Sequence, residues 1–115
     1  GVDVEPTAGE PLSRTVLERC CTPREVDRLC AMPAEQRHAA FVELWTRKEA
    51  LLKATGQGLR REPNTLSVLD DDDRSIADDA SWSYRALDLA AGHAGAVAAR
   101  GAGWRLACWE LAPCS

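Results

Sequence analysis

The segment between Pro33 and Gly56 constrains the fold more than any other, because its pattern predicts a single long helix. Apolar residues recur there at the three- and four-residue spacings of one helical face, namely Phe41, Leu44, Trp45, Leu51 and Leu52. Proline favours the start of a helix and glycine its end, so the helix is expected to run from Pro33 to about Thr55. Every other element has to pack around this helix.

Shorter elements are predicted on both sides of the long helix. A strand is expected at residues 1–5, where apolar and polar residues alternate. Two short helices follow, at 12–20 and 23–31, and Thr22 and Pro23 form the start of the second. Downstream, turn-rich breaks separate four strand candidates, at 65–69, 82–89, 93–99 and 104–111. One strand, then helices, then strands predict an α+β domain with helices packed on an antiparallel sheet.

Composition limits the classes of protein to which the chain can belong. Its 115 residues allow one domain, and 45% hydrophobic with 28% charged residues is ordinary for a soluble globular protein. No apolar run approaches the roughly 20 residues of a membrane helix, and no signal peptide is visible, so we expect a cytoplasmic protein without a membrane partner. A net charge of −4 argues against nucleic acid as a partner. Five cysteines without a C-x-x-C pair are expected to be reduced and structural.

Two carboxylates are expected side by side on the first strand. Side chains two residues apart project from the same face of a strand, which brings Asp3 and Glu5 to roughly 7 Å from each other at the backbone. Val2 and Val4 are expected to point the other way, into the core. One interpretation is an edge strand with a solvated acidic face. The other is a site for a hard divalent cation, usually Mg²⁺ when phosphates complete its shell.

The long helix adds a third acid and two lysines. Lys48 falls in the middle of the apolar stripe, where an ammonium needs a partner or a route to solvent. Glu49 lies one helical turn after Trp45, and Lys53 lies one turn after Glu49. A surface ion pair is the plain interpretation of Glu49 and Lys53, and core packing is that of Trp45.

The distribution of lysine favours a functional site near Glu49. Twelve of the 14 basic residues are arginine, and the only lysines are Lys48 and Lys53. A site that needs a compact ammonium, such as one that contacts phosphate oxygens, would explain this pattern. The sequence contains neither a P-loop nor a G-x-G-x-x-G fingerprint, and it has no G-x-S-x-G elbow.

Two segments resemble motifs of the Sfp-type 4′-phosphopantetheinyl transferases. Residues 1–5, GVDVE, are similar to the G-[VI]-D-[VI]-E motif of that family. Residues 45–59, WTRKEALLKATGQGL, are similar to its W-[ST]-x-K-E-A-x-x-K-x-x-G-x-G-L motif. Residues 87–98 resemble its later strand pair, with Ala91 and His93 in place of the usual proline and tyrosine. The resemblance spans the whole chain.

The resemblance implies an activity and a set of site residues. These enzymes transfer the 4′-phosphopantetheine arm of coenzyme A to a serine of an acyl or peptidyl carrier protein and release 3′,5′-adenosine bisphosphate, as in polyketide or nonribosomal peptide biosynthesis. Asp3, Glu5 and Glu49 would hold Mg²⁺, and Asp3, Lys48 and Lys53 would face coenzyme A. Glu49 and Lys53 would be catalytic, since Glu49 could help to deprotonate the carrier serine and Lys53 could contact the phosphates.

Length is the main departure from the family pattern. Sfp-type enzymes are about twice as long and consist of two similar halves, so residues 1–115 are expected to form the second, metal-binding half of that pseudo-dimer. The chain would then need its first half, or another copy of itself, as a partner. One alternative is an incomplete half that binds metal or carrier protein without turnover. Another is a homo-oligomeric holo-acyl-carrier-protein synthase, although that subfamily lacks the D-x-E pair and the tryptophan.

Overall fold

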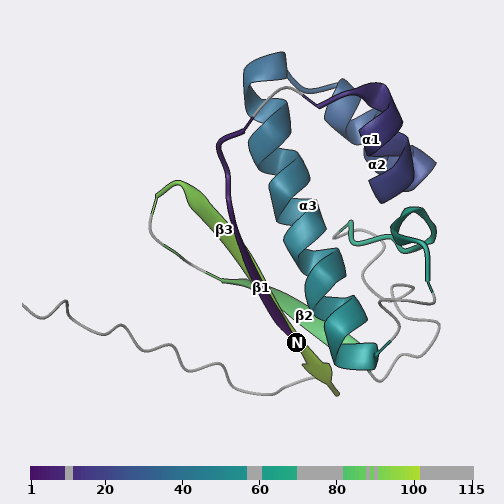
Figure 1. Cartoon of the computed structure of the whole chain (residues 1–115), viewed down its shortest axis with the longest axis vertical. Helices are drawn as coiled ribbons and strands as arrows, with labels where there is room; N and C mark the ends of the chain where they lie inside the picture. Colours follow the sequence, from purple (N-terminus) through teal and green to yellow (C-terminus); the bar gives the residue numbers. More distant parts are fainter. Residues whose placement is uncertain (10–11, 57–60, 70–81, 88, 90, 102–115) are drawn as a thin grey trace, which may run out of the picture.

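The computed structural model describes the chain except for residues 10–11, 57–60, 70–81, 88, 90 and 102–115. The described residues form three helices, three strands and one short 3-10 helix, and Figure 1 shows their arrangement. In chain order they are β1 (Val2–Pro6), α1 (Arg14–Cys20), α2 (Pro23–Cys30), α3 (Ala34–Thr55), the 3-10 helix η1 (Pro63–Thr65), β2 (Trp82–Leu87) and β3 (His93–Arg100). The α+β class is confirmed: helices pack on a small antiparallel sheet.

The helices begin and end where their local sequences direct. The Thr22 hydroxyl accepts a hydrogen bond from the Glu25 backbone N–H, and the Glu25 carboxylate accepts one from the Thr22 N–H, which together form a capping box on α2. α3 ends at Gly56, whose φ of +72° is a left-handed conformation that glycine adopts without strain. The long helix therefore has the predicted bounds.

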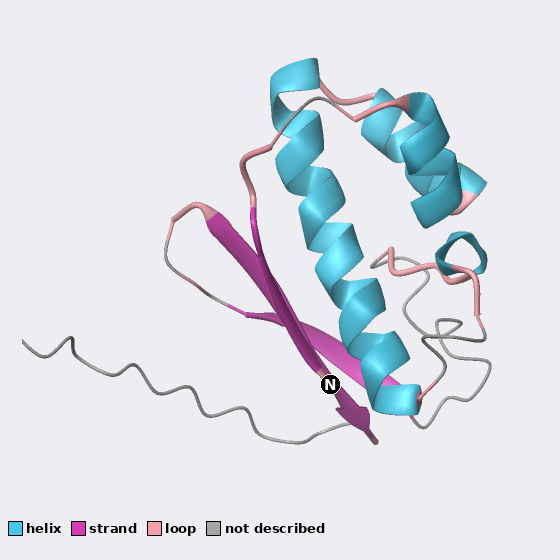
Figure 2. Ribbon diagram, in the orientation of Figure 1, coloured by secondary structure: helices cyan, strands magenta, loops and turns pink. Residues whose placement is uncertain are grey.

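The sheet has the strand order β1–β3–β2, and both pairs of neighbours are antiparallel. α3 lies across one face of this sheet (Figure 2). The β3 side chains beneath α3 are all alanines, Ala94, Ala96 and Ala98, and each is at most 8% exposed. Small side chains at these three positions let the helix approach the strand closely, which brings α3 within reach of β1 as well.

α3 is buried on two sides, because α1, α2 and η1 lie beyond it from the sheet (Figure 1). Its sheet side and its α1–α2 side both contribute to the core, which is why buried residues occur around most of its circumference. Two of these buried residues, Thr46 and Lys48, are polar. The position of α3 between two layers sends neighbouring side chains of one helix into two different environments.

The predicted orientation of β1 is wrong. Val2 and Val4 were expected in the core, but they are 54% and 49% exposed, whereas Asp3 is only 8% exposed. The reason is that α3 covers the face of β1 from which Asp3 projects, and the described residues place no layer over the other face. The apolar side of β1 therefore lies on the open face of the sheet.

Two of the downstream strand predictions are not matched by a strand among the described residues. Residues 65–69 do not form a strand. Glu25 Oε2 accepts the Val68 N–H at 2.9 Å and Tyr84 Oη donates to the Val68 carbonyl at 2.9 Å, so side chains replace strand partners for this backbone. The strand predicted at 104–111 lies outside the described residues. No helix among those described is both long and apolar enough to cross a membrane.

Candidate functional site

The centre of the site is a contact between β1 and α3. Lys53 Nζ lies 2.9 Å from Asp3 Oδ1 and 3.3 Å from the Val2 carbonyl oxygen. The side chain of Lys53 is half exposed, while that of Asp3 is 8% exposed. The second carboxylate oxygen, Asp3 Oδ2, is buried and has no hydrogen-bond partner among the described residues. A buried carboxylate with one free oxygen is an acceptor available to a cation.

Gly1 allows β1 to approach α3 this closely. A Cβ atom built on Gly1 would lie 2.9 Å from Lys53 Cβ and 2.8 Å from the Ala54 nitrogen, and still closer to the Ala50 carbonyl oxygen. No side chain fits in that space without a shift of the strand or the helix. The glycine that opens the first motif therefore helps to bring Asp3 and Lys53 together.

Glu49 belongs electrostatically to the same group. Partial burial raises the pKa of its carboxyl group, and the negative charges of Asp3 and, more weakly, Glu5 raise it further, while the ammonium of Lys53 lowers it. The hydrogen bond to Asp3 is the main cause that raises the pKa of Lys53. Asp3, Glu5, Glu49 and Lys53 thus form one interacting cluster of charges.

In this structure the carboxylates of the cluster are not arranged as a set of metal ligands. Within the described part of the chain, no three or more His, Cys, Asp or Glu side chains are arranged so that they could hold a metal ion. The chemistry of the site nevertheless fits a hard cation, because carboxylate oxygens are its preferred ligands and Asp3 Oδ2 is unpartnered. Lys53 is the positive charge beside Asp3 in this structure.

Lys48 lies in a different environment. Its ammonium is fully buried and donates to the carboxylate of Glu25, to the Cys20 carbonyl at 2.8 Å and to the Pro63 carbonyl at 2.9 Å. Three donors therefore meet three acceptors. The carboxylate of Glu25 in turn accepts from the backbone N–H groups of Thr22 and Val68. We refer to these groups as the Lys48–Glu25 network.

The structure does not support the predicted contact of Lys48 with coenzyme A. All three N–H groups are used inside the protein, and the side chain has no exposed surface. The partner that its central place in the apolar stripe required is Glu25, which we did not predict as a site residue. No local signal separates a glutamate in the first turn of a helix from one that also binds a lysine 23 residues away.

Residues 1–100 match the family model of the 4′-phosphopantetheinyl transferase superfamily. The chain belongs to this superfamily. The matched residues include Asp3, Glu5, Glu49 and Lys53, together with Lys48 and Glu25.

Two curated relatives in the superfamily show how much of such a protein the chain represents. It is 31% identical over 111 residues to the 4′-phosphopantetheinyl transferase HetI of Nostoc sp., a match that covers 96% of the chain and 47% of the relative. It is 37% identical over 59 residues to the 4′-phosphopantetheinyl transferase psf-1 of Bacillus pumilus, covering 51% of the chain and 24% of the relative. The chain therefore spans about half the length of HetI. No solved structure is significantly similar to it.

Trp45, part of the second superfamily motif, has a packing role. Its ring stacks on Phe41 with 6.3 Å between ring centroids and 13° between ring planes. The side chain is half-buried against the core. The plain interpretation of this residue, core packing, is confirmed.

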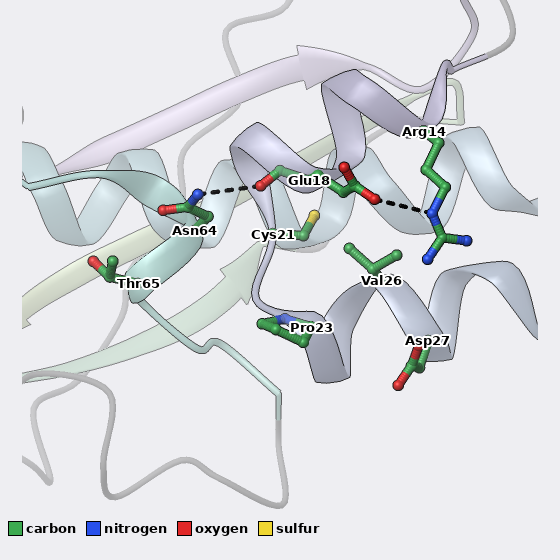
Figure 3. A pocket seen from close by; sticks show the side chains of 8 residues that line it. All are labelled: Arg14, Glu18, Cys21, Pro23, Val26, Asp27, Asn64 and Thr65. Atoms are coloured by element: carbon green, nitrogen blue, oxygen red, sulfur yellow. Dashed lines mark hydrogen bonds and ion pairs between the residues drawn. The ribbon is translucent and has the colours of Figure 1, made fainter.

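A cavity of about 480 Å³ lies between α1, α2 and η1 (Figure 3). It is separate from the charged cluster formed by Asp3, Glu49 and Lys53. Its lining includes buried Cys21 and Val26, and Arg14 and Glu18 form an exposed ion pair beside it. Asn64 donates a hydrogen bond to the Glu18 carbonyl across the same region. Neither Asp3, Glu49 nor Lys53 lines this cavity, so it is not part of the candidate site.

Proposed function

We propose that this chain carries the acidic, metal-binding site of an enzyme that transfers the 4′-phosphopantetheine arm of coenzyme A to a serine of an acyl or peptidyl carrier protein. Membership of the superfamily supports this reaction class. The observation that carries the site assignment is the contact of Lys53 with Asp3, beside Glu49. These residues come from the two motifs, 50 positions apart in the sequence.

The proposed step balances as a phosphoryl transfer. The serine Oγ attacks the phosphorus that bears the pantetheine arm, and a new O–P bond forms. The bond from this phosphorus to the bridging oxygen of the pyrophosphate breaks, and its electron pair leaves with 3′,5′-adenosine bisphosphate. The serine proton goes to a base, for which Glu49 is the candidate, either directly or through a water molecule.

Each residue of the cluster has a defined role in this proposal. Asp3, Glu5 and Glu49 would hold Mg²⁺, which when bound would neutralise the charge that develops on the leaving phosphate. The side chain of Lys53 is half exposed, and its ammonium would contact phosphate oxygens from the side opposite its anchor on β1. A raised pKa suits a base, because a carboxylate with a higher proton affinity accepts a proton more readily.

A second half would complete the site. The chain covers 47% of HetI, so coenzyme A would contact residues outside it as well. Val2, Val4 and Leu89 are exposed on or beside the open face of the sheet, and this face would lie against the second half or another copy of the chain. We place the reaction in the cytoplasm, in carrier-protein pathways such as polyketide or nonribosomal peptide synthesis.

Mass spectrometry of an apo carrier protein tests the proposed function. The full-length protein is incubated with coenzyme A, Mg²⁺ and the carrier, and the expected product is heavier by one phosphopantetheine arm and depends on Mg²⁺. Asp3→Ala and Glu49→Ala should each abolish the transfer, whereas Glu18→Gln on α1 should not change it. Wild-type turnover in Asp3→Ala or Glu49→Ala would refute the site. Metal binding by the wild-type protein without any transfer would favour the alternative of a binding half without turnover.

A further inference from the structure

The Lys48–Glu25 network is a buried group of hydrogen-bonded polar atoms, and the proposed reaction does not use it directly. Both side chains have no exposed surface. The network joins the end of α1 at Cys20, the first turn of α2 at Thr22, η1 at Pro63 and the following segment at Val68. All four segments are hydrogen-bonded to Lys48 of α3, either directly or through Glu25.

Lys48 directly precedes Glu49 in the sequence of α3. Successive residues of an α-helix point about 100° apart around its axis, so Lys48 and Glu49 face different layers. Lys48 faces α1, α2 and η1. Glu49 and, one turn later, Lys53 face the β1 side, where Lys53 meets Asp3. The rotation of α3 that satisfies Lys48 is therefore the same rotation that turns Glu49 toward Asp3.

The network also ties the end of α1 to the part of α3 that carries Glu49. Burial is the main cause that raises the pKa of the Cys20 thiol, while the charge of Lys48 lowers it and that of Glu49 raises it further. Cys20 is the residue whose carbonyl oxygen accepts from Lys48. The hydrogen bond from Lys48 to Cys20 therefore holds the end of α1 against the residue that precedes Glu49.

We propose that Glu25 is a positioning residue for the transfer reaction, because through Lys48 it holds α3 in the rotation that directs Glu49 and Lys53 at Asp3. This inference rests on the proposed function. A rotation of about 20° would move a group at the 5–6 Å radius of the helix surface by about 2 Å. A displacement of about 1 Å at a reacting group can reduce a rate by about 100-fold.

A purely structural role makes a different prediction. Loss of one partner of a buried pair leaves an uncompensated charge and destabilises the fold, but loss of both charges together is often neutral or stabilising. If the network served stability alone, a double variant without either charge would regain both folding and activity. If it positions α3, the double variant would regain folding without regaining the rate.

The experiment compares Glu25→Gln, Lys48→Met and the double variant in the full-length protein. Thermal unfolding gives the folded fraction, and carrier-protein assays give kcat and KM per folded molecule. We expect Lys48→Met to melt at the lowest temperature and the double variant to recover most of that loss. We also expect kcat of the folded double variant to stay about 10- to 100-fold below wild type, with KM for coenzyme A and for the carrier within about threefold.

The control is Glu18→Gln, which removes an exposed ion pair on α1 and should alter neither stability nor kcat. A folded double variant with kcat within twofold of wild type would overturn the inference. So would activity losses that follow the unfolded fraction in every variant, because the network would then act on stability alone. Absence of transfer by the wild-type protein would instead reject the proposed function, and with it the reaction that Glu25 is inferred to support.

Discussion

Lys53 on α3 donates a hydrogen bond to Asp3 on β1, with 2.9 Å between Nζ and Oδ1. The same ammonium lies 3.3 Å from the carbonyl oxygen of Val2. Asp3 therefore has a positive partner on one oxygen and no described partner on the other. Lys53 and a divalent cation would compete for the same carboxylate, because each compensates its negative charge.

Replacement of Lys53 by methionine should tighten divalent metal binding in the absence of coenzyme A. Methionine keeps an unbranched side chain of similar length and removes the positive charge that competes for Asp3. Since the ammonium is half exposed, the gain should be modest, about two- to fivefold in the dissociation constant. Titration with Mn²⁺ as an Mg²⁺ substitute, followed by electron paramagnetic resonance, measures it.

Arg14→Met is the matched control for this titration. It removes a cation that belongs to an exposed pair with Glu18 on α1 and should leave Mn²⁺ affinity unchanged. Weaker Mn²⁺ binding by Lys53→Met would show that the ammonium supports the metal site instead of competing with it.

Lys53→Arg should impair transfer although it preserves the charge. The Lys53 ammonium fits between Asp3 and the Val2 carbonyl as a compact donor, and a planar guanidinium is larger and has a fixed geometry. We expect kcat/KM for coenzyme A to fall by about tenfold or more. Steady-state kinetics provide the measurement, with Arg14→Lys as the reverse exchange at an exposed position. An unchanged kcat/KM for coenzyme A in Lys53→Arg would mean that lysine at this position is not required.

The open face of the sheet should make the isolated chain self-associate. Val2 and Val4 are about half exposed there, and apolar surface of this kind favours contact with another protein surface. Val4→Glu should shift the chain toward monomer in size-exclusion chromatography with light scattering. Val16→Glu is a matched control, because Val16 is 41% exposed but lies on α1. A wild-type chain that stays monomeric at high concentration would contradict this prediction.

The buried thiol of Cys21 should make the fold less stable at alkaline pH. Burial raises its pKa to about 12, whereas a thiol in the unfolded chain titrates at about 8.5. Between these values the unfolded state releases a proton that the native state retains, so this contribution to stability is complete below about pH 8.5 and is lost as pH rises. Urea unfolding at pH 7 and pH 10 measures the loss.

The variant Cys21→Ala measures how much of the loss of stability at alkaline pH is due to this thiol. The variant should be less stable at pH 7, because a small buried group is missing, but its stability should decline less toward pH 10. We expect the difference between the two declines to be about 1–2 kcal/mol. Parallel declines for the wild-type protein and the variant would assign the alkaline loss to other groups.

Much of the fold was predictable because its signals are local. The capping box at Thr22 and Glu25, the stop at Gly56 and the apolar spacing of α3 all act within a few residues of the chain. The two motifs likewise predicted that Asp3, Glu49 and Lys53 belong to one site. In the structure Lys53 binds Asp3, and both charges act on the pKa of Glu49, but their role in a site stays a prediction. The predicted convergence of Asp3, Glu5 and Glu49 on one ion remains a proposal.

The sequence by itself therefore determined the helices, their ends, the α+β class and the family. Tertiary structure alone decided which face of β1 is covered, since alternation creates two faces but only the position of α3 selects one. It also decided that Lys48 binds Glu25 while Lys53 binds Asp3. Both lysines lie on one helix within five residues, but that helix is packed between two layers. The partner of each charge is therefore set by long-range contacts, which local sequence does not encode.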